Sequence, residues 1–437
     1  MKKRNKRRVF LGVQEIAGIM ERLNNAYHEA GIQSEFYCMD DYAFSPDELE
    51  RKEHSILKKY KIHTNKRIQA QKEYERNWWY FLQMWDILYI FIYVLFKYDD
   101  FIYIFGHGMF FYNKYLSRIE EMEFFILKIF HKRMVMWLCG SDSRAPYCDV
   151  FMHTYSNKIG KLYKETQRRS KKVKMLEKYM TVIDMPASSH FHTKSYLIYN
   201  CVGIPVDEKE KVINRKLHNK ITILHAPSNQ KGKGTKIIKD ILRQIKEEGY
   251  DFEYVEVSGL PHNIVLEKMA MCDIVIDQLY SDTPMAGFAS EAAINGVPVI
   301  VSGYYAEVYK DSIPQPIAPT IFCKPDELKE KIIFLLEHEE ERIRIGRCEK
   351  EYIENYCLSS IVANRLLNIL DGVYPREWIM HPNENNYIWG GGVDKPLVIE
   401  GIVKLIDNYG RDSLGLDRNS VLYKKYIQLY NEAKSCV

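Results

Sequence analysis

Short apolar strands that alternate with amphipathic helices are the feature that most limits how this 437-residue chain can fold. The chain begins with the strand pattern "RVFLGV" (8–13), and apolar residues then recur at helical spacing from Ile16 to Tyr27. Gly31 marks the expected end of that helix, and "SEFYCM" is the next strand. This order of strand, helix and strand predicts an α/β domain with a parallel, doubly wound sheet.

The same pattern starts again in the second half of the chain. Strands are predicted at "KITILHA", "FEYVEVSG", "DIVIDQL" and "VPVIVSG", with helical patterns between them. We therefore expect two α/β domains, at 1–204 and 205–370. The last segment, 371–437, has mixed polarity and no clear period, and it is interpreted as a C-terminal extension of uncertain structure.

Composition excludes several classes of protein. Hydrophobic residues make up 46% and charged residues 27% of the chain, which is typical of a globular protein. A net charge of +4 is too small to indicate nucleic-acid binding. Nine cysteines occur without a CxxC pair, so neither a disulfide framework nor a zinc site is expected. The short apolar run near the start does not fit a signal peptide, and we expect a cytoplasmic protein.

An aromatic segment, "WWYFLQMWDILYIFIYVLF" (78–96), is long enough to cross a membrane. Three features favour a buried or membrane-skimming helix instead. Aromatic residues occupy its middle, Asp86 would be costly in lipid, and the strand "FIYIF" (101–105) follows directly. Lysines and arginines cluster at 51–67 and 168–178, either as solvated helix faces or as groups that attract the inner face of a membrane.

A basic, glycine-rich loop, "HAPSNQKGKGTK" (225–236), follows the first strand of the second half. Ligands of open α/β sheets bind beyond the carboxyl ends of the strands, where this loop lies. Lys231 and Lys233 supply positive charge, and Gly234 permits close approach of the backbone at a helix start. The loop predicts an anion site, although an ordinary loop with surface lysines has the same composition.

A second loop, "DQLYSDTPMAGFASEAAINGVPVIVSG" (277–303), should lie at the same edge of the sheet. Gly287 and Phe288 precede Glu291, which is expected in the first turn of a helix. A carboxylate there either stabilises the helix dipole or accepts hydrogen bonds from sugar hydroxyls. The cationic loop and this carboxylate together suit a nucleoside diphosphate, with the lysines on the phosphates and Glu291 on the ribose.

On these residues the chain resembles the GT-B-fold glycosyltransferases, and within them the retaining group called glycosyltransferase family four. The resemblance is strongest in "HAPSN", "DIVIDQL" and "GFASEAAINGVPVI", and looser in "FGHG" (105–108) and "CGSDSR" (139–144). It spans about residues 8–370. It implies two Rossmann-like doubly wound domains that face each other across a cleft, with the tail outside the resemblance.

The resemblance also implies roles for single residues. Lys233 matches the lysine that holds the donor diphosphate, and Glu291 matches the second acid of the family's E-x7-E motif. His107, between two glycines at a strand end, is a candidate for the histidine near the transferred sugar. Gly12 is expected in the first loop, near the donor phosphates.

Two positions depart from the family pattern. The first acid of E-x7-E falls at Thr283, beside Asp282, which is therefore a further catalytic candidate. The family's diphosphate arginine has no clear equivalent, and Gln230 and Lys231 stand near its place.

The sequence thus predicts an enzyme that moves a sugar from a nucleoside diphosphate to a glycan or lipid-linked acceptor in polysaccharide biosynthesis, with retention implied by the resemblance. Positive charge and a helix N-terminus can stabilise the leaving diphosphate without a metal, so no metal or cofactor is expected. The protein would be cytoplasmic or peripheral on the inner membrane face. Two alternatives stay open: a nucleotide-sugar epimerase of the same fold, and a transferase-like protein that binds sugar or a partner without catalysis.

Overall fold

The structure is a computed structural model that describes residues 7–40, 55–211 and 220–435, so the first residues of the basic run 51–67 lie outside it. The chain forms two compact units, each built from segments distant in sequence. Unit 1 comprises Met1–Leu138, Met175–Val182 and Ala363–Tyr374. Unit 2 comprises Cys139–Lys174, Ile183–Val362 and Pro375–Val437. Each unit is described by itself below.

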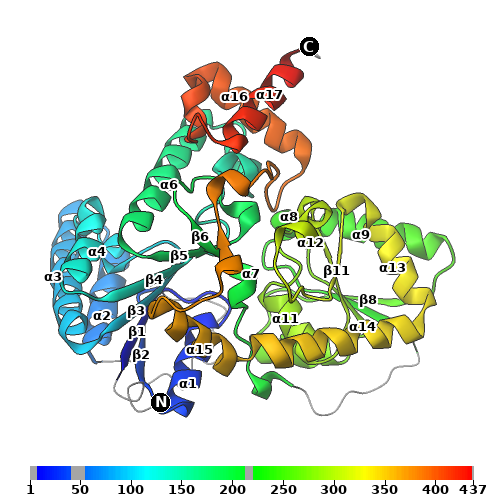
Figure 1. The fold of residues 1–437 in the computed structure, drawn as a ribbon, viewed down its shortest axis with the longest axis horizontal. Helices are drawn as coiled ribbons and strands as arrows, with labels where there is room; N and C mark the ends of the chain where they lie inside the picture. The colour runs from blue at the N-terminus through cyan, green and yellow to red at the C-terminus, as the bar shows by residue number, and fades with distance from the viewer. Residues whose placement is uncertain (1–6, 41–54, 212–219, 436–437) are drawn as a thin grey trace. The chain divides into compact units, whose positions relative to one another are not determined.

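The strands form two sheets, as predicted (Figure 1). The first has the order β12-β6-β5-β4-β3-β1-β2 and the second the order β11-β10-β9-β7-β8. The strands of the first sheet are β1 (Arg8–Val13), β2 (Gln33–Cys38), β3 (Asp100–Ile104), β4 (Arg133–Trp137), β5 (Thr181–Asp184), β6 (Tyr196–Ile198) and β12 (Ile379–Met380). Those of the second are β7 (Thr222–His225), β8 (Glu253–Glu256), β9 (Ile274–Ile276), β10 (Val299–Ser302) and β11 (Ile321–Cys323). In both sheets the first strand in sequence lies inside the sheet, which is the doubly wound arrangement.

Unit 1 is organised around β1, which pairs with β2 on one side and β3 on the other and whose apolar side chains are fully buried. Pairing with both neighbours is parallel, because a helix connects each strand to the next. Tyr27 donates a hydrogen bond to the carbonyl oxygen of Ala363 at 3.1 Å, so a late segment packs on the first helix. The helices that contribute to this unit are α1 (Ile19–Glu29), α2 (Ser55–Gln69), α3 (Glu73–Lys97), α4 (Glu120–Ile129) and parts of α6 (Ile159–Tyr179) and α15 (Ser359–Leu370).

Unit 2 contains the second sheet with helices on both of its faces. Two apolar clusters cover these faces, one around Val275 and Val299 and the other around Ile223 and Ile276. Helix α9 shows why the local pattern folds this way, since Ile238, Leu242 and Ile245 recur at helical spacing and are buried. The helices of unit 2 are most of α6, the start of α15, and α5 (Met152–Tyr155), α7 (Tyr199–Val202), α8 (Gln230–Lys233), α9 (Thr235–Glu247), α10 (His262–Ala270), α11 (Gly287–Ile294), α12 (Tyr309–Ser312), α13 (Leu328–Glu337), α14 (Glu339–Tyr352), α16 (Lys395–Tyr409) and α17 (Val421–Ser435).

The C-terminal segment is part of the fold of unit 2. Strand β12 pairs antiparallel with β6, and α16 and α17 lie beside α6 (Figure 1). Ile402 and Leu405 of α16 share one buried cluster with Tyr147 and Met152. The segment therefore contributes to a core that residues 145–191 cannot complete alone.

Candidate functional site

The basic loop after β7 has a defined shape that depends on Asn229 and Gly234. The Asn229 side chain accepts a hydrogen bond from the Gly232 N–H at 3.1 Å and so caps the single turn α8. Gly234 has φ of +70°, and a Cβ there would lie 2.6 Å from the Cβ of Leu279. Both the conformation and the contact require glycine. Helix α9 begins at the next residue without a side-chain cap.

Lys233 is fixed by a buried carboxylate, whereas Lys231 is exposed. The Lys233 Nζ lies 2.7 Å from Oδ1 of Asp277, whose other oxygen, Oδ2, is buried and accepts no hydrogen bond. The Leu279 N–H also donates to the Lys233 carbonyl oxygen at 3.0 Å. These contacts join the loop after β7 to the loop after β9, as the sequence predicted for two loops at one edge of the sheet.

His225 supports this corner, and sequence reasoning missed it. Its Nδ1 lies 2.9 Å from the Ile276 carbonyl oxygen, which can only accept, so Nδ1 carries the proton. Its Nε2 lies 2.9 Å from the Thr235 hydroxyl at the start of α9. Burial lowers the pKa of His225, which keeps the ring neutral and able to accept there. The ring thus connects two strand ends to the first residue of α9.

Glu291 lies deeper in its helix than predicted. Helix α11 begins at Gly287, so Glu291 is in the second turn, and the expectation of a first-turn carboxylate is wrong. The helix already includes Gly287 and Phe288, and the packing of Phe288 on the core favours this earlier start. Glu291 is buried, and its Oε1 lies 2.9 Å from Nε2 of His262. The pair places a titratable ring beside the candidate ribose-binding carboxylate.

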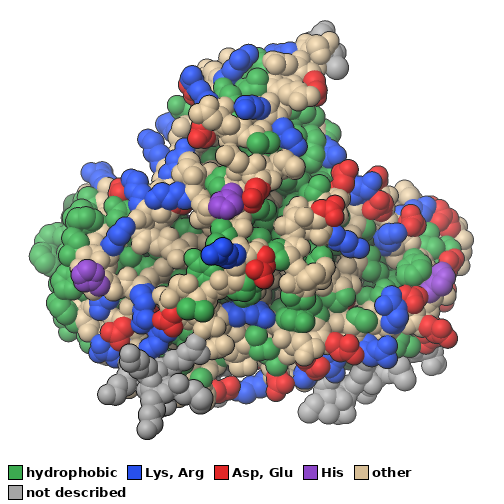
Figure 2. Space-filling model, in the orientation of Figure 1, with side chains coloured by type: hydrophobic (Ala, Val, Ile, Leu, Met, Phe, Trp, Pro, Cys, Tyr) green, Lys and Arg blue, Asp and Glu red, His purple; other side chains and the backbone are tan. Residues whose placement is uncertain are grey.

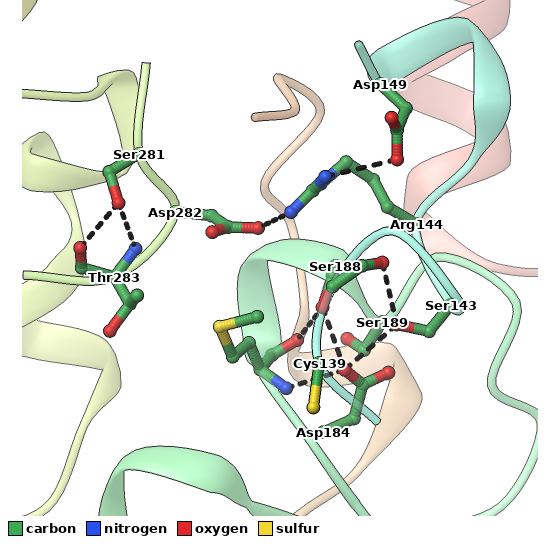
Figure 3. Close-up of polar contacts among 12 residues, drawn as sticks. Cys139, Ser143, Arg144, Asp149, Asp184, Ser188, Ser189, Ser281, Asp282 and Thr283 are labelled. Carbon is green, nitrogen blue, oxygen red and sulfur yellow. Dashed lines mark hydrogen bonds and ion pairs between the residues drawn. The ribbon is translucent and has the colours of Figure 1, made fainter. Parts of the chain in front are cut away.

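Asp282 belongs to a buried ion network with Arg144 (Figure 3). The Arg144 guanidinium contacts Asp282 on one side and lies 3.2 Å from Asp149 on the other. Asp149 also lies 3.2 Å from Arg169. Although burial opposes its charged form, the two aspartates raise the pKa of Arg144, and the network holds the charges in place. Asp282 is therefore already paired in this structure.

Thr283, which stands where the family has an acid, is also engaged. Its hydroxyl accepts a hydrogen bond from the Asn200 side chain at 3.1 Å. The Ser281 hydroxyl donates to its carbonyl oxygen at 2.6 Å and accepts from its N–H at 3.2 Å (Figure 3). Residue 283 thus shapes the loop after β9 and offers no carboxylate to a ligand.

The "GSDSR" turn is held by two carboxylates. Asp184 accepts hydrogen bonds from the hydroxyls of Ser143 and Ser188, at 3.0 and 2.8 Å (Figure 3). Asp142 accepts from the Cys139 N–H at 2.9 Å, and burial, with the nearby charge of Asp184, raises its pKa to about 7. The turn therefore presents Arg144 from a rigid base.

The C-terminal segment also reaches this network, which the sequence did not indicate. A Cβ at Gly390 would overlap the Cys148 carbonyl group, and one at Gly391 would lie 3.1 Å from the Arg144 guanidinium. The Gly392 N–H donates to the carbonyl oxygen of Tyr280 at 2.8 Å. Residues 389–392, "WGGG", include three glycines because their backbone passes against Arg144 and the loop after β9.

His107 lies in unit 1 and is mostly packed, with 12% of its side chain exposed. Its ring stacks on Phe111 with centroids 3.5 Å apart, and its Nδ1 is 3.7 Å from Glu120. Glu123 accepts hydrogen bonds from the Met109 and Phe110 N–H groups, at 3.0 and 2.8 Å. Two carboxylates of α4 therefore hold the loop that carries His107. The glycines beside His107 did not predict this packing.

Gly12 is not in a loop. It lies within β1, paired with Tyr37 and Tyr103, so its predicted place in the first loop is wrong. The loop that follows carries Glu15, which is fully buried and accepts hydrogen bonds from the N–H groups of Ile16 and Met20 at 2.8 and 3.2 Å. A carboxylate of the chain thus occupies the amides where a phosphate would otherwise bind at the start of α1.

Among residues 7–40, 55–211 and 220–435, no group of three or more His, Cys, Asp or Glu is placed to hold a metal ion. The expected metal-free chemistry stays a prediction.

No family model matches the sequence, and no curated protein matches it either. Among solved structures, sucrose-phosphate synthase from Thermosynechococcus elongatus is similar, with a TM-score of 0.50 and 12% identity over 84% of this chain and 99% of that one. Anabaena HepE, solved with UDP-glucose, has a TM-score of 0.49 and 11% identity over 84% and 100% of the two chains. WaaG, a glycosyltransferase of lipopolysaccharide biosynthesis, has a TM-score of 0.43 and 14% identity over the same shares. Similarity to the synthase confirms the predicted GT-B fold class.

Proposed function

We propose that this chain is a glycosyltransferase that takes a sugar from a nucleoside diphosphate and passes it to a glycan or lipid-linked acceptor. The observation that carries the proposal is the corner at Lys233, where an ammonium group, a glycine and the start of α9 meet at the carboxyl ends of β7 and β9. A GT-B fold whose second sheet ends in such a corner is suited to a diphosphate.

Each residue of the corner has a chemical role in the proposal. In the transfer, the bond from the sugar C1 to the diphosphate oxygen breaks while a bond to an acceptor oxygen forms, and the proton of the acceptor hydroxyl passes to the leaving diphosphate. Negative charge grows on the leaving diphosphate, and Lys233 and Lys231 would stabilise it, with Gly234 keeping the approach open. Glu291 would accept hydrogen bonds from the ribose, with Gly287 and Phe288 forming the start of its helix.

His107 and Asp282 have proposed roles that do not require contact with the donor diphosphate. His107 would face the transferred sugar, on a loop that Glu120 and Glu123 hold. Asp282 would position the loop after β9 through Arg144, because its carboxylate is already committed to that guanidinium. Gly12 keeps a packing role in the strand that leads to the first loop.

Retention of the anomeric configuration and the acceptor class are the finer parts of the proposal, and they rest on the sequence resemblance. Residues 205–370 would bind the donor and residues 1–204 the acceptor. A product made from an α-linked donor should carry an α-linkage, which the coupling constant of the anomeric proton measures. A β-linked product would contradict retention without contradicting transfer.

The test is release of nucleoside diphosphate from a panel of uridine, guanosine and adenosine diphosphate sugars, with and without polyprenyl-phosphate-linked glycan acceptors. Release that requires acceptor is the expected result. An altered sugar without release would indicate the epimerase, and binding with neither outcome would indicate a non-catalytic protein. The second alternative draws on Thr283, which supplies no carboxylate at the first acid position.

Lys233→Ala should remove most turnover, but it also leaves the buried carboxylate of Asp277 without its cation and should lower stability. The double variant Lys233→Ala, Asp277→Asn removes that unpaired charge and should lose turnover to the same extent, which separates the loss of activity from unfolding. Lys220→Ala is the matched control. Lys220 forms an ion pair with Asp251 at the opposite end of β7, and its loss should leave turnover unchanged. Equal turnover in Lys233→Ala and Lys220→Ala would remove Lys233 from the site.

A further inference from the structure

Helix α3 carries a stripe of large apolar side chains on its exposed side. Its six members are between 41% and 65% exposed and recur every three or four residues: Trp78, Phe81, Trp85, Tyr89, Ile92 and Phe96. At about 100° per residue they fall within an arc of roughly 80°, along about 27 Å of helix. An exposed apolar stripe of this length marks a surface that contacts something other than water.

Helix α4 extends the stripe into a broader surface. Met122, Phe125 and Ile129 are each more than 40% exposed, and the ring of Phe130 lies 5.8 Å from that of Phe96. We call the six residues of α3, with Met122, Phe125, Ile129 and Phe130, the apolar face. Figure 2 shows hydrophobic side chains gathered at the left edge of the view, over α3.

The opposite side of α3 is bound into unit 1. Asp86 is buried and contacts His63 of α2, while the Gln83 side chain donates to the Thr64 hydroxyl at 2.8 Å. The ring of Phe91 packs on Phe110 with centroids 5.1 Å apart. In the described part of the chain, α3 is the one helix long and apolar enough to cross a bilayer by length and composition. Crossing would break these contacts, so α3 is built to lie along a surface and not to span it.

The apolar face carries no charged side chain of its own, and cations lie on the elements that bear it. From 77 to 96 the only charged residue is Asp86, which is buried. Five cations lie over aromatic rings of α3 and α6, with distances to the ring centroids of 4.6–5.5 Å. At about 100° per residue, Tyr93 with Lys97 flanks the stripe, whereas Trp79 with Lys66 and Tyr80 with Arg67 and Lys114 lie on other sides of α3. Lys128 of α4 lies over Tyr179. Acidic side chains near it are Glu73 and Glu75 at the start of α3, Glu121, which lies 3.3 Å from Lys178, and Glu35, which pairs with Lys97 at 2.5 Å.

We propose that the apolar face docks on an anionic lipid bilayer, with α3 lying in the plane of the interface. Tryptophan and tyrosine prefer the headgroup region, and lysine and arginine beside them would contact lipid phosphates. This charge pattern favours an anionic bilayer over a second copy of the chain, which would have the same cations on the elements that bear its apolar face. The inference is drawn from unit 1 alone and does not depend on the proposed transfer.

The test is sedimentation of the full chain with vesicles. Binding to vesicles of phosphatidylglycerol and phosphatidylcholine is expected, with at least tenfold weaker binding to phosphatidylcholine alone and a decrease at high salt. The triple variant Trp85→Ser, Tyr89→Ser, Phe96→Ser should lose binding and keep the wild-type unfolding midpoint, because these side chains are exposed. The double variant Ile343→Ser, Val373→Ser is the matched control, since these residues are 62% and 64% exposed elsewhere.

Three results would overturn the proposal. The wild-type chain could remain in the supernatant with anionic vesicles, or the triple variant could sediment as the wild type does. Sedimentation equilibrium could also show a dimer that the triple variant abolishes, without vesicle binding, which would make the face an interface between copies. None of these results would bear on nucleotide-sugar turnover, so failure here and failure of the proposed function are distinguishable.

Discussion

Glu123 illustrates at the residue scale how a buried carboxylate can hold a loop and still make stability depend on pH. Burial raises its pKa to about 7 against the hydrogen bonds from the Met109 and Phe110 N–H groups. A carboxyl whose pKa is higher in the folded chain binds its proton more tightly there. The stability it contributes is therefore complete below pH 4.5 and is lost as the pH rises through about 7.

Glu123→Gln should remove this pH dependence. Between pH 5 and pH 8 the difference in free energy of unfolding between wild type and variant should change by about 2–3 kcal/mol, with wild type losing more as the pH rises. Urea unfolding at the two pH values measures it. Parallel pH profiles for the two proteins would show that Glu123 does not titrate in this range.

Arg144 carries a second prediction at this scale, because it is buried between Asp282 and Asp149. Arg144→Ala leaves the buried carboxylate of Asp282 without its cation, while Asp149 keeps its contact with Arg169, and should cost about 3–5 kcal/mol of unfolding free energy. Arg418→Ala removes an exposed arginine that pairs with Asp412, and it should leave the unfolding midpoint almost unchanged. If both variants unfolded like wild type, the buried network would make no contribution to the free energy of unfolding.

At the scale of elements, Gly234 is the residue between the end of α8 and the start of α9. Gly234→Ala must place a Cβ 2.6 Å from that of Leu279 at φ of +70°, and overpacking of this kind costs about 1–3 kcal/mol. Gly372→Ala has a matched positive φ of +72° with no atom within 4 Å, so it isolates the backbone cost. Urea unfolding should show a larger loss for Gly234→Ala, and equal losses would mean that the contact with Leu279 relaxes freely.

The order of elements was largely predictable, whereas contacts between distant elements were not. Strands β1 and β3 lie within one residue of their predicted bounds, because buried parallel strands are nearly continuous apolar runs. The pair of Arg144 and Asp282 joins positions 138 residues apart, and no local pattern encodes such a contact. Glu15 at the start of α1 was missed for a related reason, since a carboxylate that accepts backbone N–H groups resembles any loop glutamate in sequence.

At the scale of the whole molecule, the C-terminal segment is the part that sequence reasoning described least well. Its apolar residues are spread among polar ones because α16 and α17 bury only one side each, against a core supplied by residues 145–191. The buried side chains of this segment share one cluster with residues 145–191, so the segment's own sequence does not show that it completes that core.

Ile402→Ala tests that role. Ile402 of α16 is fully buried, so truncation should cost about 2–5 kcal/mol of unfolding free energy. Ile343 of α14 is 62% exposed, and Ile343→Ala should change the unfolding free energy by less than about 0.5 kcal/mol. A cost for Ile402→Ala as small as that of the control would mean that the segment is an appendage after all.

The central claim is that the corner at Lys233 binds the diphosphate of a nucleotide sugar. Isothermal titration of uridine, guanosine and adenosine diphosphates into wild type, Lys233→Ala and Lys220→Ala measures it most directly. One of the three nucleotides should bind wild type and the Lys220 variant with equal affinity. The same nucleotide should bind the Lys233 variant roughly tenfold to hundredfold more weakly, as expected for loss of a charged hydrogen bond. No binding by wild type, or equal affinity in all three proteins, would contradict it.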